Sequence, residues 1–354
     1  MFPANHKAPT RPNPRGSRVR RDLSGSWWNS AHALLDADRI FSVMSPADAV
    51  NALSSALVAG FDPADDLSRV VNPIDKGQLL LMPSEVGTGI GIKVMTLGRD
   101  NPERGLPVIQ GSYLMFDGDT LAPTAVLDGA ALTTLRTPAV SVVGIRPALE
   151  RFDGPLRLVV FGTGPQGTSH VDTLADVVSE PFADVTFVSR APENVGDDVT
   201  FVSRAPENVG DDVISRGSVV AAGSPELDAV LTRADVVVCA TPAEEPLFSA
   251  DAVRSDVVVI AMGSHSPGAR EVPGALMARA QVVVEDVETA LREAGDVVLA
   301  IADGDLSRDD LLLMKDVVRG DAELDPSRPL VFKTVGMPWQ DLAVAQVVLE
   351  RATR

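Results

Sequence analysis

A glycine-rich segment near the middle of the chain has the spacing used by dinucleotide-binding sites. It reads Gly162-Thr163-Gly164-Pro165-Gln166-Gly167 and follows a short apolar run, 158–161. Glycines at this spacing let the backbone turn tightly and approach a pyrophosphate, whose charge the free amides of the next helix bind. We therefore predict a dinucleotide site and a helix over 166–178. Its candidate residues are Gly162, Gly164, Pro165 and Gln166. Packing alone also produces such turns, so the motif by itself does not decide.

The end of the second strand of such a fold indicates which dinucleotide is bound. An Asp or Glu there binds a free ribose 2′-hydroxyl and repels a 2′-phosphate. Here the strand Val-Thr-Phe-Val-Ser-Arg ends in Ser189 and Arg190, whose hydroxyl and guanidinium favour a phosphate. We therefore expect NADP(H), with NAD(H) as the alternative cofactor. A surface arginine without a function is the competing interpretation.

A tandem repeat affects this assignment, because residues 186–199 recur unchanged as residues 200–213. A period of 14 residues is too short for a solenoid unit, so it does not indicate a repeat architecture. The first copy follows the glycine-rich helix at the usual distance, and we assign the strand to it. In the alternative assignment, Ser203 and Arg204 of the second copy take the place of Ser189 and Arg190.

Among the cations that precede the glycine-rich segment, three are candidates for a ligand site: Arg69, Lys93 and Arg136. Lys93 is the most informative of them, because it lies in Gly91-Ile92-Lys93-Val94, which reads as an alternating apolar strand. A lysine in such a strand either extends its charge to solvent or directs it at an anionic ligand. Spacing alone favours the solvent-directed lysine.

The residues before the glycine-rich segment predict two helices and then an antiparallel sheet. Apolar residues over 31–59 recur at helical spacing, and Ser45-Pro46 suits an N-cap followed by proline at the first helical position. From Gln78 to Phe116 the pattern changes to short apolar runs separated by Gly, Pro and Asn turns. These runs are 78–82, 91–95 and 112–116.

Beyond Leu156, short apolar strands alternate with helical or loop segments, which is typical of a doubly wound parallel sheet. We expect strands at 158–161, 235–240, 257–262 and 281–285. The final helix, 340–351, is expected to return to the first domain. The sequence therefore predicts an α/β protein with a flexible tail at 1–30, a discontinuous domain at 31–150 plus 322–354, and a Rossmann dinucleotide-binding domain at 151–321.

Composition limits the classes of function. A net charge of −18 over 354 residues provides no basic surface for nucleic acid. No apolar stretch approaches the ~20 residues that span a bilayer, and residues 1–22 lack the apolar core of a secretion signal. We expect a cytoplasmic enzyme without a membrane partner. The single cysteine, Cys239, is expected in a buried strand, and no grouping of Cys and His suggests a metal site.

Several ordered motifs together resemble the ornithine cyclodeaminase and mu-crystallin family over about residues 34–345. They are Ile92-Lys93-Val94 with Asn101-Pro102, Gly105-Leu106-Pro107, Phe116-Asp117, Leu132-Thr133 with Leu135-Arg136-Thr137, the glycine-rich segment, Ala234-Asp235-Val236-Val237 with Ala240-Thr241, Gly263 with Pro267-Gly268 and Arg270-Glu271, and Phe332-Lys333 with Val335-Gly336. The resemblance implies a Rossmann domain beside a discontinuous α+β substrate and dimerisation domain. It also implies a homodimer and a nicotinamide cofactor used on small amino or imino acids.

The resemblance further implies roles for single residues. Arg69, Lys93 and Arg136 map to the cationic cluster that holds the substrate carboxylate, and bidentate pairing there would fix the α-carbon for hydride transfer. Lys93 is also a candidate for proton transfer at the nitrogen. Thr241 and Gly336 are expected near the ribose or nicotinamide of the cofactor.

One loop departs from the family pattern. In cyclodeaminases the loop written here as residues 263–268 carries an Asp that moves protons during amine attack and ammonia loss, whereas this chain has His265. An imidazole exchanges protons near neutral pH but supplies no fixed negative charge for a cationic iminium. The family's imine reductases also lack that Asp, so the resemblance favours reduction. A loop histidine that only lines the cleft is the alternative.

We therefore expect an NADP(H)-dependent oxidoreductase of the C=N or CH–NH bond, acting on a cyclic imino acid or on an α-keto acid plus an amine. Lys93 and His265 are the candidate catalytic residues. A cyclodeaminase for ornithine or lysine with bound NAD is the first alternative, and it would release ammonia without net consumption of cofactor. A cofactor-binding protein without turnover is the second.

Overall fold

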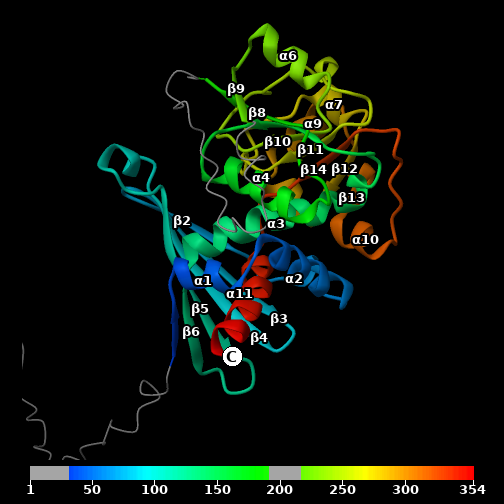
Figure 1. The fold of residues 1–354 in the computed structure, drawn as a ribbon. Helices are drawn as coiled ribbons and strands as arrows, with labels where there is room; N and C mark the ends of the chain where they lie inside the picture. Colours follow the sequence, from blue (N-terminus) through cyan, green and yellow to red (C-terminus); the bar gives the residue numbers. More distant parts are fainter. Residues whose placement is uncertain (1–31, 191–216) are drawn as a thin grey trace, which may run out of the picture.

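Two β-sheets organise the described residues of the protein, which are 32–190 and 217–354 in the computed structural model. The first sheet has six strands in the order β1-β6-β5-β4-β3-β2, and the second has eight in the order β13-β12-β14-β11-β10-β7-β8-β9. Figure 1 shows the sheets in separate halves of the molecule, with helix α3 (Gly129–Leu149) between them. The chain is an α/β protein with a Rossmann-like parallel sheet and a separate mixed sheet, as the sequence predicts.

The six-stranded sheet is mixed, because β1 pairs with β6 in parallel and the other neighbours pair antiparallel. Its strands are β1 (Ala33–Leu35), β2 (Val70–Ile74), β3 (Gly77–Val86), β4 (Gly89–Leu97), β5 (Ile109–Asp117) and β6 (Pro123–Asp128). The three expected apolar runs lie in β3, β4 and β5, so the predicted antiparallel sheet is confirmed. Residues of β4 alternate between buried and half-buried positions, and Lys93 falls on the buried face.

Helices pack against the buried face of this sheet and against one another. They are α1 (Ala37–Val43), α2 (Pro46–Val58), α3 and α11 (Pro338–Thr353). α11 contacts β3 and β4, and α3 contacts β5. α2 begins with the predicted cap, because Ser45 accepts a hydrogen bond from the Asp48 amide and Pro46 is the first helical residue. In the described ranges, no helix is long and apolar enough to cross a membrane.

The eight-stranded sheet is parallel throughout. Its strands are β7 (Arg157–Phe161), β8 (Asp184–Ser189), β9 (Gly217–Ala221), β10 (Val236–Cys239), β11 (Val258–Ala261), β12 (Gln281–Val284), β13 (Leu311–Leu313) and β14 (Leu330–Lys333). Its helices are α4 (Pro165–Val177), α6 (Pro225–Leu231), α7 (Gly274–Met277), α8 (Val287–Glu293), α9 (Gly295–Asp303) and α10 (Met314–Arg319). Short 3-10 turns η3 (Pro63–Asp65), η4 (Asn101–Arg104), η6 (Ala250–Ala252) and η7 (Arg308–Asp310) complete the elements.

The strand order of the parallel sheet reverses at β7. From β7 the chain proceeds to β8 and β9 on one side, and it then enters β10 on the other side of β7. A ligand crevice forms at such a point outside the carboxyl ends of the strands, because successive connections leave in opposite directions. α4 follows β7 directly, so the glycine-rich segment lies at this crevice.

The parallel sheet extends beyond residue 321, where we expected the Rossmann domain to end. β14 pairs with β11 on one side and with β12 on the other. All of its residues are buried, as is typical of a central parallel strand that is covered on both faces. The expected domain boundary at residue 321 is therefore wrong, because β14 belongs to the parallel sheet. Of the residues after 321, those of α11 contact the mixed sheet.

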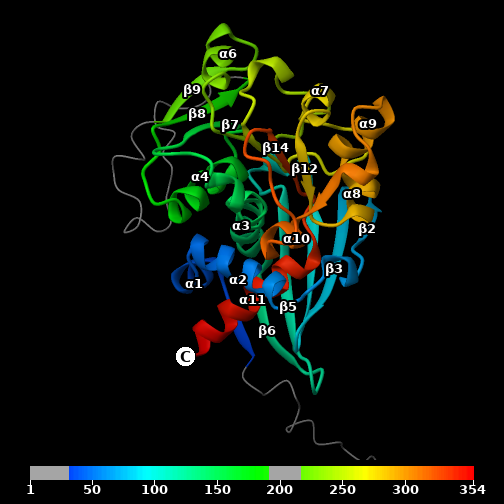
Figure 2. The same cartoon turned by 90° about the vertical axis from the view of Figure 1, so that its right-hand side faces the viewer.

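Helix α3 joins the two halves of the molecule. It contacts β5 of the mixed sheet, β11 and β14 of the parallel sheet, and the glycine-rich helix α4. Figure 2 shows α3 between α4 and the lower helices α2 and α11. A residue on α3 can therefore be held against both sheets at once.

Candidate active site

The glycine-rich turn has the backbone geometry that a dinucleotide requires. Gly162 has φ +106°, and a Cβ there would lie 2.5 Å from the carbonyl oxygen of Ala240. A Cβ on Gly167 would lie 2.0 Å from the Gly162 carbonyl oxygen, so this glycine lets α4 pack close to the turn. Gly164 caps α4 without a side-chain hydrogen bond and has open space beside it. The turn therefore fits a pyrophosphate at the start of α4.

Gln166 lies on the first turn of α4 and adds a polar group to this site. Its side-chain oxygen is buried and has no hydrogen-bond partner among the described residues. A buried polar atom without a partner is uncommon and calls for a ligand or water. The assignment of Gln166 to the cofactor site stays a prediction.

The first repeat copy supplies the strand beside the glycine-rich turn. β8 ends at Ser189, and Arg190 follows it with an exposed side chain. The Gly162 amide donates to the Val188 carbonyl oxygen at 3.3 Å, which places the turn next to the end of β8. The assignment of the strand to the first copy is confirmed, whereas Ser203 and Arg204 lie outside the described residues.

Lys93 does not extend to solvent, contrary to the expectation from spacing. Its side chain is fully buried. Its ammonium group donates to Asp341 Oδ1 at 2.9 Å, to Asp341 Oδ2 at 2.7 Å and to Thr133 Oγ1 at 3.2 Å. Alternation along β4 directs Lys93 toward α3 and α11, where these acceptors lie. Burial, followed by the charge of Arg136, lowers the pKa of Lys93 to about 8.

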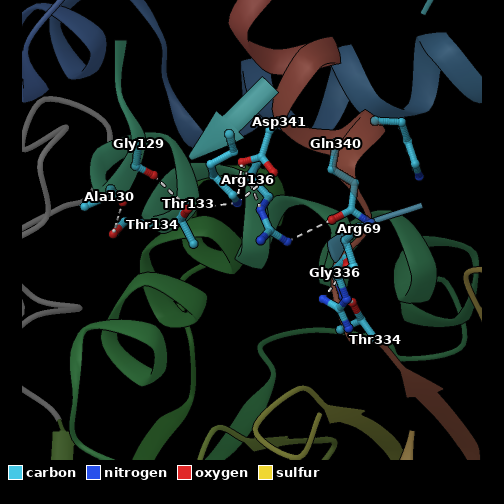
Figure 3. A network of polar contacts seen from close by, with 12 residues as sticks. Arg69, Gly129, Ala130, Thr133, Thr134, Arg136, Thr334, Gly336, Gln340 and Asp341 are labelled. Atoms are coloured by element: carbon cyan, nitrogen blue, oxygen red, sulfur yellow. Dashed lines mark hydrogen bonds and ion pairs between the residues drawn. The ribbon is translucent and has the colours of Figure 1, made fainter. Parts of the chain in front are cut away.

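Arg136, which lies on α3, is next to Lys93 and is held by α11, the helix that carries Asp341. Its Nη1 donates to Gln340 Oε1 at 2.9 Å, and its Nε lies 3.4 Å from Asp341 Oδ1. In Figure 3 the side chains of Arg136, Gln340 and Asp341 point toward one another, with Gly336 close by. Gly336 has φ +75°, and a Cβ there would lie 2.6 Å from Arg136 Nη1, so the contact requires glycine.

Arg69 completes the cationic group from the segment before β2. Its Nη1 donates to the carbonyl oxygens of Val335 at 3.1 Å and Gly336 at 3.2 Å, and its Nη2 pairs with Glu293. Burial lowers the pKa of Arg69 to about 10. The structure thus brings Arg69, Lys93 and Arg136 together around the connection from β14 to α11, although they are far apart in sequence.

Glu285, which follows β12, fixes that connection. Its carboxylate accepts hydrogen bonds from Thr334 Oγ1 at 2.8 Å, from the amides of Val335 at 3.0 Å and Gly336 at 3.2 Å, and from the Gln340 side chain. Asp341, Gln340 and Glu285 were not predicted from the sequence. A signal existed for Asp341, because Asp341, Leu342, Ala345 and Val348 share the buried face of α11, where a carboxylate is out of place.

Thr241 and the loop after β11 are held by one buried carboxylate. Glu271 accepts from the Thr241 amide and hydroxyl, each at 2.8 Å, and from the Gly263 amide at 2.7 Å and the Ser264 amide at 3.2 Å. Burial raises the pKa of Glu271. Thr241 follows β10 and lies next to the glycine-rich turn, since Gly162 faces the Ala240 carbonyl.

His265 lies in the same loop and is exposed. Its Nδ1 lies 3.3 Å from the Gly263 carbonyl oxygen. Partial burial of the ring lowers the pKa of His265, and the charges of Arg69, Lys333 and Arg99 lower it further. The effect of Arg69 places His265 within electrostatic reach of the cationic group.

The candidate residues meet at one edge of the parallel sheet. Gly162 follows β7, Thr241 follows β10, the loop with His265 follows β11, and Gly336 follows β14. Carboxyl ends of parallel strands share an edge, and this is where ligands bind in open α/β sheets. The contact of Gly336 with Arg136 joins the cationic group to that edge. The arrangement can hold a dinucleotide and a small carboxylate side by side.

Neither a metal group nor a reactive thiol accompanies this site. Within residues 32–190 and 217–354, no group of three or more His, Cys, Asp and Glu side chains could hold a metal ion. Cys239 is fully buried in β10, as the sequence predicts, and burial raises its pKa.

Comparison with known proteins identifies a family and relatives that this chain resembles. Residues 32–354 match the ornithine cyclodeaminase/mu-crystallin family. The chain is 29% identical to ketimine reductase mu-crystallin of Mus musculus over 329 residues, which cover 90% of this chain and 97% of that protein. It is 30% identical to Delta(1)-pyrroline-2-carboxylate reductase 2 of Burkholderia ambifaria over 290 residues, which cover 78% of this chain and 82% of that protein.

A solved structure has the same fold. An archaeal alanine dehydrogenase, a dimer with bound NAD, matches with a TM-score of 0.76 and 25% sequence identity. The match covers 91% of this chain and 96% of that one.

Proposed function

Because this chain belongs to the ornithine cyclodeaminase/mu-crystallin family, we propose that its cationic group binds the carboxylate of a cyclic imino acid whose C=N bond is then reduced. The reaction class is that of an NAD(P)H-dependent oxidoreductase acting on the C=N or CH–NH bond of an amino or imino acid. The substrate and the residue roles below are our proposal.

The observation that carries the proposal is the meeting of Arg69 and Arg136 at Gly336, next to the dinucleotide crevice. Lys93 is joined to Arg136 through Asp341. Arg136 is the principal carboxylate ligand. Its Nη2 makes no hydrogen bond within the described ranges, whereas Arg69 already binds two carbonyl groups and Glu293. Lys93 and Arg69 lie within electrostatic range of Arg136, but each is already paired with a carboxylate, so the Arg136 Nη2 group is the one left for an anion.

The glycine-rich turn would hold the cofactor. Gly162, Gly164, Pro165 and Gln166 would contact the pyrophosphate, and Thr241 and Gly336 would flank the ribose and nicotinamide. A bound reduced nicotinamide supplies the hydride in this chemistry. Ser189 and Arg190 would bind the 2′-phosphate, so we propose NADPH as the preferred cofactor, with the exposed guanidinium of Arg190 as the support.

The protein supplies the proton. The C=N bond becomes C–H and N–H, so the ring nitrogen needs one proton for each hydride that reaches the neighbouring carbon. The Lys93 ammonium, whose pKa is lowered to about 8, carries a proton at neutral pH and can release it. The neutral amine that remains would take its next proton from water that enters the site as the product leaves. His265, exposed in the loop after β11, is the second candidate donor and would act through the small fraction of its imidazole that is protonated.

His265 separates this proposal from cyclodeamination. A cyclodeaminase needs a carboxylate in that loop to move protons and to stabilise a cationic intermediate, as the family resemblance implies. Partial burial, together with the nearby positive charges, lowers the pKa of His265, so the imidazole is mainly neutral at neutral pH and cannot replace a carboxylate. Reduction of a preformed imine needs no such group.

A second copy of this chain is our proposed partner. The outer face of the mixed sheet carries half-buried apolar side chains on neighbouring strands, where no helix of the described chain packs. They are Leu79 and Leu81 on β3, Ile92 and Val94 on β4, and Leu114 and Phe116 on β5. A contiguous apolar face of this kind marks a protein interface. We propose that the same face of another copy covers it.

An assay of purified protein tests the reaction. NADPH absorbance is followed with cyclic imino acids, and ammonia is measured in parallel with L-ornithine or L-lysine and NAD⁺. Stoichiometric loss of NADPH with an imino acid, abolished in Lys93→Met, is the expected result. Ammonia release without net change in cofactor would show a cyclodeaminase instead. Binding of NADPH without turnover of either kind of substrate would leave only a binding protein.

A further inference from the structure

The first turn of α11 places a carboxylate between two cations of the substrate site. Asp341 accepts both of its short hydrogen bonds from Lys93, at 2.9 and 2.7 Å, and lies 3.4 Å from Arg136 Nε. Lys93 comes from β4 and Arg136 from α3, so this one side chain joins three elements. Asp341 belongs to none of the motifs that suggested the family.

The pair is closed to solvent. Asp341 and Lys93 are both fully buried. The third contact of the ammonium group is Thr133 Oγ1, which itself donates to the Gly129 carbonyl oxygen at 2.7 Å and therefore accepts from Lys93. A buried ion keeps its charge only when partners replace water, so the charge of Lys93 depends on these contacts.

The groups around Lys93 act on its pKa in opposite directions. Burial lowers the pKa of Lys93 most, the charges of Arg136 on α3 and of Arg69 before β2 lower it further, and Asp341 on α11 raises it. Tyr113 on β5 is the cross-strand neighbour of Lys93, and burial together with Asp341 and Asp66 raises its pKa above the usual range. It is therefore neutral. Asp341 is the group that opposes the loss of the lysine's charge.

We propose that Asp341 is the positioning residue of this site, which keeps the Lys93 ammonium charged in its buried place and sets the orientation of Arg136. The carboxylate touches neither substrate nor cofactor in this scheme and acts through the two cations. The proposal rests on the proposed function for the reaction that Lys93 serves, whereas the coupling between Asp341 and Lys93 can be measured without it.

A titration of lysine side chains tests the coupling directly. The chain has five lysines, Lys7, Lys76, Lys93, Lys315 and Lys333. Carbon-13 labelling at lysine Cε gives one NMR signal for each, and the signal missing in Lys93→Met is that of Lys93. In Asp341→Asn the midpoint of Lys93 should fall by about one pH unit or more, since one nearby opposite charge shifts a pKa by this amount. An unchanged midpoint would overturn the proposal.

Two further variants make the titration decisive. Asp341→Glu keeps a carboxylate, so Lys93 should titrate close to its wild-type midpoint; a fall of about one pH unit or more in this variant would contradict the proposal, whether or not the Asn variant folds. Asp48→Asn is the matched control, because it removes the ion pair with Arg351 near the other end of α11 without touching Lys93. It should leave the Lys93 midpoint unchanged.

Kinetics then connect the coupling to the reaction. The proton donor must be charged, so kcat/KM for imine reduction should fall as pH rises through the pKa of Lys93. In Asp341→Asn this alkaline limb should move to lower pH, in parallel with the NMR midpoint. KM should rise, because Arg136 loses the ion pair with Asp341 that orients its guanidinium. A wild-type protein without imine reduction would refute the proposed function and leave the NMR result standing. A shifted NMR midpoint with an unmoved limb would show that Lys93 is not the proton donor.

Discussion

At the scale of single residues, we expect the guanidinium of Arg136 to contribute most to substrate affinity. Among the described residues, Arg136 Nη2 makes no hydrogen bond, while Gln340 accepts from Nη1. Lysine in its place would keep the charge but lose the planar fork. We expect Arg136→Lys to raise KM for the imino acid by about 10- to 100-fold, corresponding to one or two lost charge-assisted hydrogen bonds. Steady-state kinetics with saturating NADPH measure it.

The control for this prediction lies on the same helix. Arg146 is exposed in the last turn of α3. Arg146→Lys should therefore change neither KM nor NADPH affinity. An Arg136→Lys variant with the wild-type KM would show that the carboxylate is bound elsewhere.

Arg190 is the residue that we propose to select the cofactor. Its side chain is exposed at the end of β8, beside the glycine-rich turn. Arg190→Ala should weaken NADPH binding by about 10-fold or more and leave NADH binding unchanged, because only NADPH has the 2′-phosphate. Fluorescence titration with both cofactors measures the ratio. If the ratio stays constant, the 2′-phosphate has another ligand, and Arg204→Ala is the next variant to titrate.

Residue roles that depend on distant partners could not be predicted from the sequence. Lys93 and Asp341 are 248 positions apart, and nothing around Lys93 in the sequence indicates a buried carboxylate. Spacing therefore favoured an exposed lysine, and the fold reverses this because β4 directs that face at α11. The glycines of the dinucleotide turn were predictable, since their backbone requirement is local.

At the scale of elements, periodicity predicted most of the apolar strands of the parallel sheet and missed β9, β13 and β14. β7, β10, β11 and β12 lie where the sequence placed them. β14 is as short as β10, β11 and β12, but it ends in Lys333, and this charge interrupts the apolar run that identifies a buried strand. Lys333 is tolerated there because it pairs with buried Asp296 at 2.9 Å.

The connection from β14 to α11 sets the position of the cationic group, and one substitution tests it. In Gly336→Ala the new Cβ would lie 2.6 Å from Arg136 Nη1, so the guanidinium must move. We expect KM for the imino acid to rise by about 10-fold or more, as for a lost charged hydrogen bond. The positive φ of +75° adds backbone strain, which lowers stability as well.

Gly304→Ala separates the two effects. Gly304 has φ +83° at the end of α9, and no heavy atom lies within 4 Å of the place that an alanine methyl group would take. This variant should lower the melting temperature to a similar degree and leave KM unchanged. Equal KM values in Gly336→Ala and the wild type would show that the guanidinium does not depend on this contact.

At the scale of the whole molecule, the mixed sheet has an apolar outer face that no helix of the described residues covers. Leu81 on β3 and Val94 on β4 are direct cross-strand neighbours on that face and are half-buried without a covering helix among the described elements. If a second copy covers them, two carboxylates at these positions must lose their water inside the interface. We expect the double variant Leu81→Asp, Val94→Asp to sediment as a monomer where the wild type sediments as a dimer.

A variant outside the face shows whether the effect is specific. Leu121 is an exposed apolar residue in the turn between β5 and β6, with φ +58°, a conformation that Asp adopts more readily than Leu. Leu121→Asp should therefore remain a dimer with unchanged stability. Sedimentation velocity of the three proteins at equal concentration gives the answer. A double variant that stays dimeric and folded would place the interface on another surface, whereas a monomer that still binds NADPH would locate it on this sheet.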